Sequence, residues 1–325
     1  MENFLTVAQQ VAILFVLIGT GAVLRKLKVI PEHAIEGLVN LLILVVTPCL
    51  IVDVFQRPYD PSMLKGLLLA FGIAALGHFA VIAIAYATVR HRDANVVRPL
   101  RMAAVFSNAG FMGLPLEQAL LGDRGVFYGV VYIVVFNLFM WSWGVGAMRR
   151  EELRVKSEEL GMHARTLRSS LFTLHSVVNP GTVGIACGLP LFFLSVKLPA
   201  VIGVPVHEIA TLNTPVAMIV IGYCLVGAKL GRVVKMACVY VATAVRLLVY
   251  PLLMIAALYP FRHALDRNMM LAVVIAASAP VAAMVSMFAA KFGRDVDVSV
   301  AVVSGSTLLS VLTMPAVIAF AMSVL

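Results

Sequence analysis

Apolar segments of about 20 residues recur along the whole chain and are separated by short polar connections. This length matches an α-helix that crosses the hydrocarbon core of a bilayer. We predict ten transmembrane helices, at residues 5–24, 35–55, 64–89, 101–121, 125–147, 178–197, 206–227, 236–259, 268–290 and 298–322. The pattern therefore predicts an all-α membrane protein.

The longest polar connection lies between the fifth and sixth predicted helices and begins with MRREELRVKSEELGMHARTLRSS. It mixes both charge signs at helical spacing, which favours a short helix on the membrane surface over a regulatory site. We therefore divide the chain into residues 1–147, a cytoplasmic connecting segment at 148–177, and residues 178–325.

Composition supports the membrane prediction. Of the 325 residues, 62% are hydrophobic and 13% are charged, with a mean hydropathy of +1.00, whereas soluble proteins carry roughly 25% charged residues. The 25 Lys and Arg exceed the 16 Asp and Glu, but these basic residues lie mostly in short loops. Membrane topology explains such a distribution, so we expect the lipid bilayer and no nucleic acid as a partner.

The distribution of positive charge also predicts orientation. Loops after the odd-numbered helices hold 18 Lys and Arg, against six on the other side: Arg57, Lys65, Arg124, Lys197, Arg262 and Arg267. Positive loops face the cytoplasm, so both termini should lie outside a cell inner (plasma) membrane. The first apolar segment leads directly into Arg25 and Lys26 without a small-residue cleavage site, which predicts a retained helix.

The two halves of the chain resemble copies of each other. Five pairs of unusual residues stand at nearly constant spacing, 165 to 168 residues apart: Gly21 and Gly188, Pro48 and Pro215, His78 and Arg246, Pro115 and Pro280, Asn137 and Ser304. A constant register indicates an internal repeat. With five helices per copy, the second copy enters the membrane from the opposite side, an architecture typical of secondary transporters.

The stretch FSNAGFMGLP at residues 106–115 interrupts the fourth predicted helix with glycines, an asparagine and Pro115. Because proline removes a backbone donor and clashes with the preceding turn, we expect this helix to break there, and the ninth helix to break at Pro280. Broken helices in a bilayer persist only where protein or a water-filled cavity satisfies the freed groups. We expect the two broken helices to cross near the bilayer midplane and to form a binding site.

Several side chains could complete this site. Half-helix N-termini attract anions, and Asn108, Asn137, Ser278, Ser286 and Ser304 supply polar groups. Gly110 and Gly113 would let the backbone approach a ligand or a crossing helix closely. The alternative is that these glycines and prolines only permit tight packing and a kink.

Arg246 lies near the centre of its predicted helix, where a charge is costly. It is either a counter-charge for an anionic substrate or buried carboxylate, or part of a structural ion pair with Glu117 or Asp53. His78 could carry a coupling proton, although a neutral, hydrogen-bonded histidine is favoured. Asp53 and Glu117 are further proton-carrier candidates at the outer mouth.

Other function classes find little support. The sequence has no metal-ligand spacing, no cofactor motif and no nucleotide-binding loop, which argues against direct ATP driving. His78 lacks the convergent partners that an intramembrane enzyme needs. A channel or membrane sensor on a transporter scaffold remains the alternative to a transporter.

The chain resembles a bacterial member of the auxin efflux carrier (PIN-like) membrane transport family. The motifs cover the chain: FSNAGFMGLPL (106–116), FN (136–137), NPGTVGIACGLPL (179–191), TPVAMIVIGYCLVGAKLGR (214–232), RLLVYPLL (246–253), ASAPVAAMVSMFAAKFGRD (277–295) and STLLSVLTMP (306–315). A long hydrophilic central insert, present in some plant members, is missing from this sequence.

The resemblance implies ten helices in two inverted five-helix repeats, a scaffold and a transport domain, an elevator-like movement and a homodimer. It implies organic anions as substrates, such as auxin, malate or malonate. Carried over by motif position, it makes Asn108 a substrate contact and Pro115 and Pro280 the crossover prolines.

Overall fold

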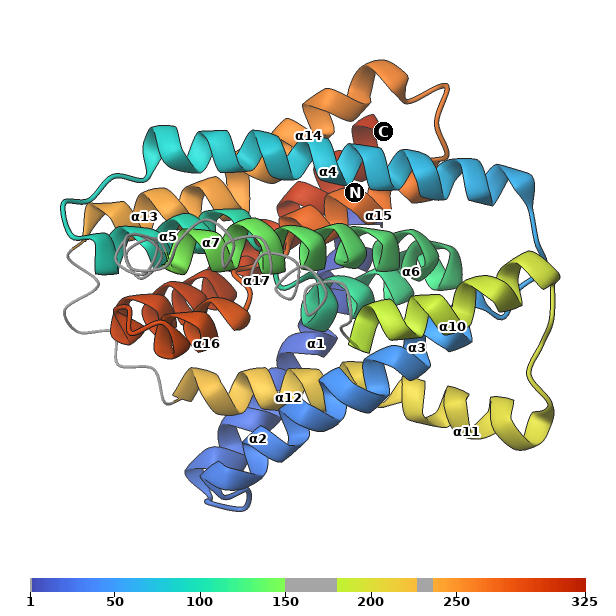
Figure 1. The fold of residues 1–325 in the computed structure, drawn as a ribbon, viewed down its shortest axis with the longest axis horizontal. Helices are drawn as coiled ribbons and strands as arrows, with labels where there is room; N and C mark the ends of the chain where they lie inside the picture. The colour runs from blue at the N-terminus through green and yellow to red at the C-terminus, as the bar shows by residue number, and fades with distance from the viewer. Residues whose placement is uncertain (1, 150–179, 227–235) are drawn as a thin grey trace, which may run out of the picture.

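The computed structural model describes residues 2–149, 180–226 and 236–325, and these residues form helices without a β-strand (Figure 1). The surface helix that the sequence predicts within 148–177 falls almost entirely on residues 150–177, which lie outside the described residues. The all-α prediction is confirmed for the described part of the chain.

The first half contains α1 (Glu2–Lys26), α2 (Glu32–Leu41), η1 (Leu42–Val46), α3 (Thr47–Phe55), α4 (Pro61–Thr88), α5 (Ala94–Val105), η2 (Ala109–Gly113), α6 (Leu114–Phe139), η3 (Met140–Gly144) and α7 (Val145–Arg149). The second half contains α10 (Pro180–Leu194), α11 (Ala200–Thr211), α12 (Asn213–Val226), α13 (Ala237–Ala244), η5 (Val245–Val249), α14 (Tyr250–Leu258), η6 (Tyr259–Phe261), α15 (Arg267–Ser278), α16 (Met284–Lys291) and α17 (Val296–Val324).

Six helical runs among the described residues are long and apolar enough to cross a membrane: His33–Phe55, Met63–Thr88, Ala109–Met148, Ala200–Tyr223, Ala237–Phe261 and Val296–Val324. The number is lower than ten partly because one run, Ala109–Met148, covers parts of two predicted helices, and because the fourth and ninth predicted helices are interrupted. The run Ala109–Met148 contains Gly122 with φ of 64°, outside the helical region, at the predicted loop between the fourth and fifth helices. Val183–Leu194 and Arg267–Ser278 are shorter apolar helices.

Three prolines in these helices follow a widened π turn. Pro48, Pro115 and Pro251 each stand two residues after the end of such a turn: η1, η2 and η5. A proline ring clashes with the carbonyl one turn earlier and cannot donate to it. An i→i+5 turn relieves that conflict without ending the helix, so these prolines are kept inside continuous helices.

The expected break at Pro115 is therefore wrong in position. The chain leaves the helical path earlier, at Phe106 and Asn108, and Pro115 lies inside the resumed helix because η2 accommodates it. In the second half the break falls where predicted, because α15 ends at Ser278 and α16 begins at Met284, with Pro280 between them. Pro115 and Pro280 are thus not equivalent break points.

The two helices that lead into the breaks resemble each other more closely than the prolines do. α5 and α15 both have 12 residues. Asp93 caps α5 by accepting from the Asn95 N–H, and Asp266 caps α15 by accepting from the Met269 N–H. Such caps satisfy amides that the first helical turn leaves without partners. Each half-helix therefore starts at a fixed residue.

Most helix contacts fall in two groups, each of which draws on both halves of the sequence, and α1 also packs on α17 across the two groups. In the first group, α1 packs on α12 and α3 packs on α10 and α11. In the second, α15 packs on α6, α14 and α17, and α4 packs on α5 and α6 (Figure 1). Every residue of α15 from Met269 to Ser278 is buried, so this short helix forms the centre of the larger group.

Glycines bring the backbones of α1 and α12 together. A Cβ built on Gly21 would lie 2.0 Å from the Ile219 carbonyl oxygen, and one on Gly222 would lie 1.8 Å from the Ile18 oxygen. Without a hydrophobic driving force between helices in lipid, such close contact supplies the association energy. On α10, a Cβ at Gly188 would lie 3.0 Å from the Phe55 Cβ of α3.

We expect Gly21→Ala to force α1 and α12 apart and to cost about 1–3 kcal/mol of stability, as overpacking does. The thermal unfolding midpoint of the purified protein measures this loss. Gly19→Ala is the matched control in the same helix, because a Cβ at Gly19 meets nothing within 4 Å. Equal midpoints for the two variants would contradict the packing argument.

Candidate functional site

The two helix breaks meet through their backbones. Ser107 and Val281 form an isolated antiparallel bridge. The Asn108 N–H donates to the Pro280 carbonyl at 2.6 Å, and the Ala282 N–H donates to the Phe106 carbonyl at 3.0 Å. Buried backbone groups without partners are costly in lipid, and here each break satisfies the other. The two broken helices therefore meet at this bridge.

Arg246 holds the ends of both leading half-helices. Its side chain is fully buried, and its Nη1 donates to the carbonyl of Val105, the last residue of α5, at 2.7 Å. Its Nη2 donates to the carbonyl of Ala277, in the last turn of α15. The guanidinium also lies 4.6 Å from the centre of the Tyr250 ring. Arg246 therefore acts as a common C-cap for the two helices.

This geometry replaces the predicted ion pair. Each helix C-terminus carries roughly half a negative charge, so two of them offset the single charge of Arg246. Asp53 instead pairs with His207 at 2.9 Å. Within the described residues, no carboxylate forms an ion pair with Arg246, and the expected ion pair with Glu117 or Asp53 is wrong.

His78 lies in an aromatic cluster behind the crossing point. It is fully buried, and its Nδ1 lies 2.8 Å from the Ala74 carbonyl, to which it donates. Its ring stacks on Phe139 at 5.1 Å and lies 5.2 Å from Tyr132. The hydroxyls of Tyr132 and Tyr250 are 3.4 Å apart. The hydrogen bond expected for a neutral histidine is present, and the role of His78 in proton coupling stays a prediction.

The sequence analysis placed Glu117 at the outer mouth, and the structure contradicts this. Its side chain is fully buried, and neither carboxyl oxygen has a hydrogen-bond partner among the described residues. The carboxyl rests against Gly129, where an added Cβ would lie 1.6 Å from Oε2. Gln118, one residue further along α6, has a different environment and lines a cavity.

The other predicted polar residues lie in two kinds of environment. Asn137 donates to the Ile133 carbonyl and Ser278 to the Ile275 carbonyl, so both bond within their own helices. Ser304 is buried, and the partly buried Ser286 has a hydroxyl without a hydrogen-bond partner among the described residues. Ser306, which the sequence reasoning missed, accepts from the Val281 N–H at 3.1 Å and supports the bridge.

The two glycines of the motif differ in their surroundings. A Cβ on Gly113 would lie 3.5 Å from the Ala276 Cα of α15, an ordinary van der Waals distance, so Gly113 faces α15 without a contact that only glycine allows. A Cβ on Gly110 would meet only the Ile133 Cδ1, at 4.0 Å. Gly110 is therefore not required by packing in this conformation.

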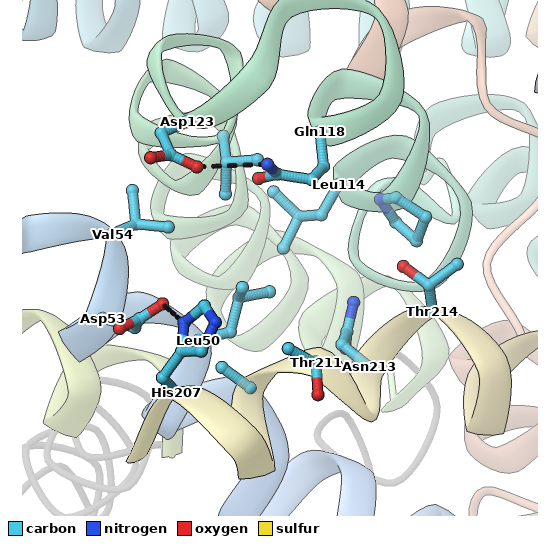
Figure 2. A pocket seen from close by; sticks show the side chains of 13 residues that line it. Leu50, Asp53, Val54, Leu114, Gln118, Asp123, His207, Thr211, Asn213 and Thr214 are labelled. Atoms are coloured by element: carbon cyan, nitrogen blue, oxygen red, sulfur yellow. Dashed lines mark hydrogen bonds and ion pairs between the residues drawn. The ribbon is translucent and has the colours of Figure 1, made fainter. Parts of the chain in front are cut away.

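A cavity of about 240 Å³ lies between the two helix groups, beside α6 (Figure 2). Its walls come from α3, α6, α11 and the start of α12. Of the predicted site residues, Pro115 and Asp53 line it. His207, Gln118, Thr211, Asn213 and Thr214 line it as well, and the sequence reasoning did not identify them.

Charged residues at the rim of this cavity are balanced. Asp53 pairs with His207, and Asp123 lies 4.0 Å from the Arg57 guanidinium, which also donates to the Asp123 carbonyl. Burial lowers the pKa of Arg57 from its ordinary value, and the nearby Asp123 carboxylate opposes that effect. Gln118 donates to the Asp123 carboxylate at 3.1 Å.

A family model described as "Membrane transport protein" matches residues 6–318. The chain belongs to this family. It is the auxin efflux carrier family that the sequence motifs resemble. A search of curated proteins finds no match. Membership makes this protein a membrane transport protein and places it in a transporter family, not an enzyme family.

For this membrane transport protein, we expect Arg246→Met to lower stability strongly. The variant leaves the carbonyls of Val105 and Ala277 buried and without these donors, at about 1–3 kcal/mol each. Arg246→Lys should recover only part of the lost stability, because a single ammonium group cannot reproduce the planar guanidinium, whose two Nη groups reach both carbonyls. Thermal unfolding of purified protein measures both.

Arg262→Lys is the matched control for Arg246. Arg262 also stacks on a tyrosine, Tyr259, and donates to its carbonyl, but near the surface. Its replacement should change the unfolding midpoint little. Full stability of Arg246→Met would contradict the capping role.

Proposed function

We propose that the protein is a secondary active transporter of small organic anions, such as malate, malonate or an auxin-like carboxylic acid. The backbone bridge between the two helix breaks carries this proposal, because it brings two half-helix starts to one buried place. η2 begins at Ala109, two residues after the bridged Ser107, and α16 begins at Met284, three residues after the bridged Val281.

The charge distribution around the bridge favours an anion. The C-terminal ends of α5 and α15 are already compensated by Arg246, whereas the N-terminal ends of the following half-helices keep their partial positive charge. Amides in a first helical turn have no partner within the helix and can bind an oxyanion. Asn108, which directly precedes η2, and the hydroxyl of Ser107 supply further polar groups.

We further propose ten transmembrane helices in two inverted repeats. Contacts within the first helix group support this arrangement. Gly188 on α10 faces Phe55 on α3. Gly21 is 167 residues before Gly188 and Gly222 is 167 residues after Phe55, and these two glycines lie where α1 meets α12. The matching lengths and caps of α5 and α15 give a second correspondence. The broken helices match at a spacing of 173 residues, from Val105 to Ser278, so the copies differ by insertions.

We propose alternating access by an elevator-type movement, and the arrangement of the helices in two groups supports this proposal. The group around α15 contains both breaks, Arg246 and His78, and so holds the proposed substrate site as one unit. Sliding of this unit along α1, α3 and α12 would carry the site across the membrane. We propose protons as coupling ions, with His78, Asp53 and Glu117 as carriers, and a homodimer in the inner membrane with both termini outside.

Uptake into proteoliposomes tests the function. We expect radiolabelled malate, malonate or indole-3-acetate to enter in a saturable manner and to show counterflow. Asn108→Ala should reduce uptake about tenfold or more, because a lost polar contact of 1–2 kcal/mol or more is a factor of about ten. Asn40→Ala, on the exposed side of α2, is the control and should transport normally.

Counterflow separates the alternatives. A channel on this scaffold conducts without counterflow, and a sensor moves no anion. Normal uptake by Asn108→Ala in folded protein would remove the crossing point as the substrate site, and uptake that is independent of a proton gradient would remove proton coupling.

A further inference from the structure

The cavity between α3, α6, α11 and α12 has the features of a separate ligand site. It has an apolar wall formed by Leu50, Val54, Leu114 and Val126. A second, more open cavity of about 380 Å³ shares Asp53, Asp123 and His207 with it and also reaches Lys197. The inner cavity thus connects with a wider opening at one end of the bundle.

The Asp53–His207 pair fixes the chemistry of one side. The His207 Nδ1 lies 2.9 Å from the Asp53 Oδ2, so the proton is held on Nδ1. A carboxylate on one ring nitrogen orients the ring and sets the tautomer. The second nitrogen, Nε2, becomes an N–H donor when His207 takes up a proton, and the side chain is 61% exposed. Figure 2 shows the ring beside Asp53 within the cavity lining.

Asn213 supplies a second polar group that has no partner in the protein. The residue is only 3% exposed, and its Oδ1 has no hydrogen-bond partner among the described residues. It lines the cavity at the first position of α12, and Thr214 follows it in the lining. The orientation of a side-chain amide is set by its partners, so Asn213 can turn its NH₂ group toward a ligand oxygen. A buried amide oxygen without a protein partner leaves a hydrogen-bonding position open to water or to a ligand.

The surrounding charges leave room for an anion. Four charged residues face or neighbour His207: Asp53 from α3, Asp123 from α6, Lys197 before α11, and Glu208 on α11 itself. Asp53 is paired with His207, and Asp123 lies beside Arg57 and Gln118. A ligand with a carboxylate and an apolar part fits a donor pair next to an apolar wall.

We propose that this cavity binds the carboxylate of an organic acid between the protonated His207 Nε2–H and the amide of Asn213, with Asp53 as the positioning residue. The inference rests on the proposed transport function, for which the cavity is the docking site at one membrane face. Binding takes up one proton on His207. Affinity therefore falls as pH rises through the histidine titration, by roughly tenfold per pH unit above it.

Binding of malate, malonate and indole-3-acetate to the purified full-length protein in nanodiscs tests the site. Isothermal titration calorimetry at about pH 6 and about pH 8 should show tighter binding at the lower pH, where His207 is protonated. His207→Gln should weaken binding at about pH 6 roughly tenfold and remove the pH dependence. His263→Gln is the matched control, since His263 is exposed and lies on the connection before α15.

Two more variants separate ligand binding from structural roles. Asn213→Ala should weaken binding at both pH values alike, because its amide does not titrate. Asp53→Asn should keep binding but shift its loss to lower pH, because the carboxylate no longer favours the protonated ring. A purely structural Asp53 would leave the pH profile unchanged.

The outcomes distinguish this site from the proposed function. If carboxylates are transported but His207→Gln and Asn213→Ala bind them with the wild-type affinity and pH profile, the site inference is overturned and the transport function stands. Absence of carboxylate binding to the wild-type protein also overturns the site. Absence of any carboxylate transport, with binding intact, overturns the transport function alone.

Discussion

The buried carbonyl groups at the ends of two broken helices are the constraint on which the rest of this structure depends. A helix that stops inside a bilayer leaves several carbonyls without partners, and lipid cannot satisfy them. Here Arg246 donates to one carbonyl from each helix, and the backbone bridge between Ser107 and Val281 satisfies the residues that follow. Each break is stable because the other break and Arg246 provide its hydrogen-bond partners.

This joint solution explains why a costly charge lies among apolar helices. Arg246 stacks on Tyr250, whose hydroxyl neighbours Tyr132, and the His78 ring packs on the same cluster. The cluster links α4, α6 and α14 beside the arginine that caps both broken helices. The cavity lies on another side of α6, where this helix meets α3, α11 and α12.

The sequence was sufficient for the all-α fold class and the family, because these depend on local hydrophobicity and on motifs. It also located the break at Pro280. It misplaced the other break because a proline was read as the point of rupture, whereas η2 absorbs Pro115. Periodicity alone could not tell that Glu117 faces inward, since the π turn changes the helical phase. The pairing of Asp53 with His207, which are 154 residues apart, needed tertiary structure.

The π turn before Pro115 also determines which residues of α6 face the buried interior and which face the cavity. Successive residues of an α-helix are rotated by about 100°, so a one-residue deletion within residues 109–113 would turn the first part of α6 by about that angle. Gln118 would then move to the place of Glu117, away from the cavity. Ala119 would take the place of Gln118 at the cavity, so the buried carboxyl would become an amide and the cavity amide a methyl group without any substitution. In this protein, the deletion of one residue can therefore change which side chains face the cavity.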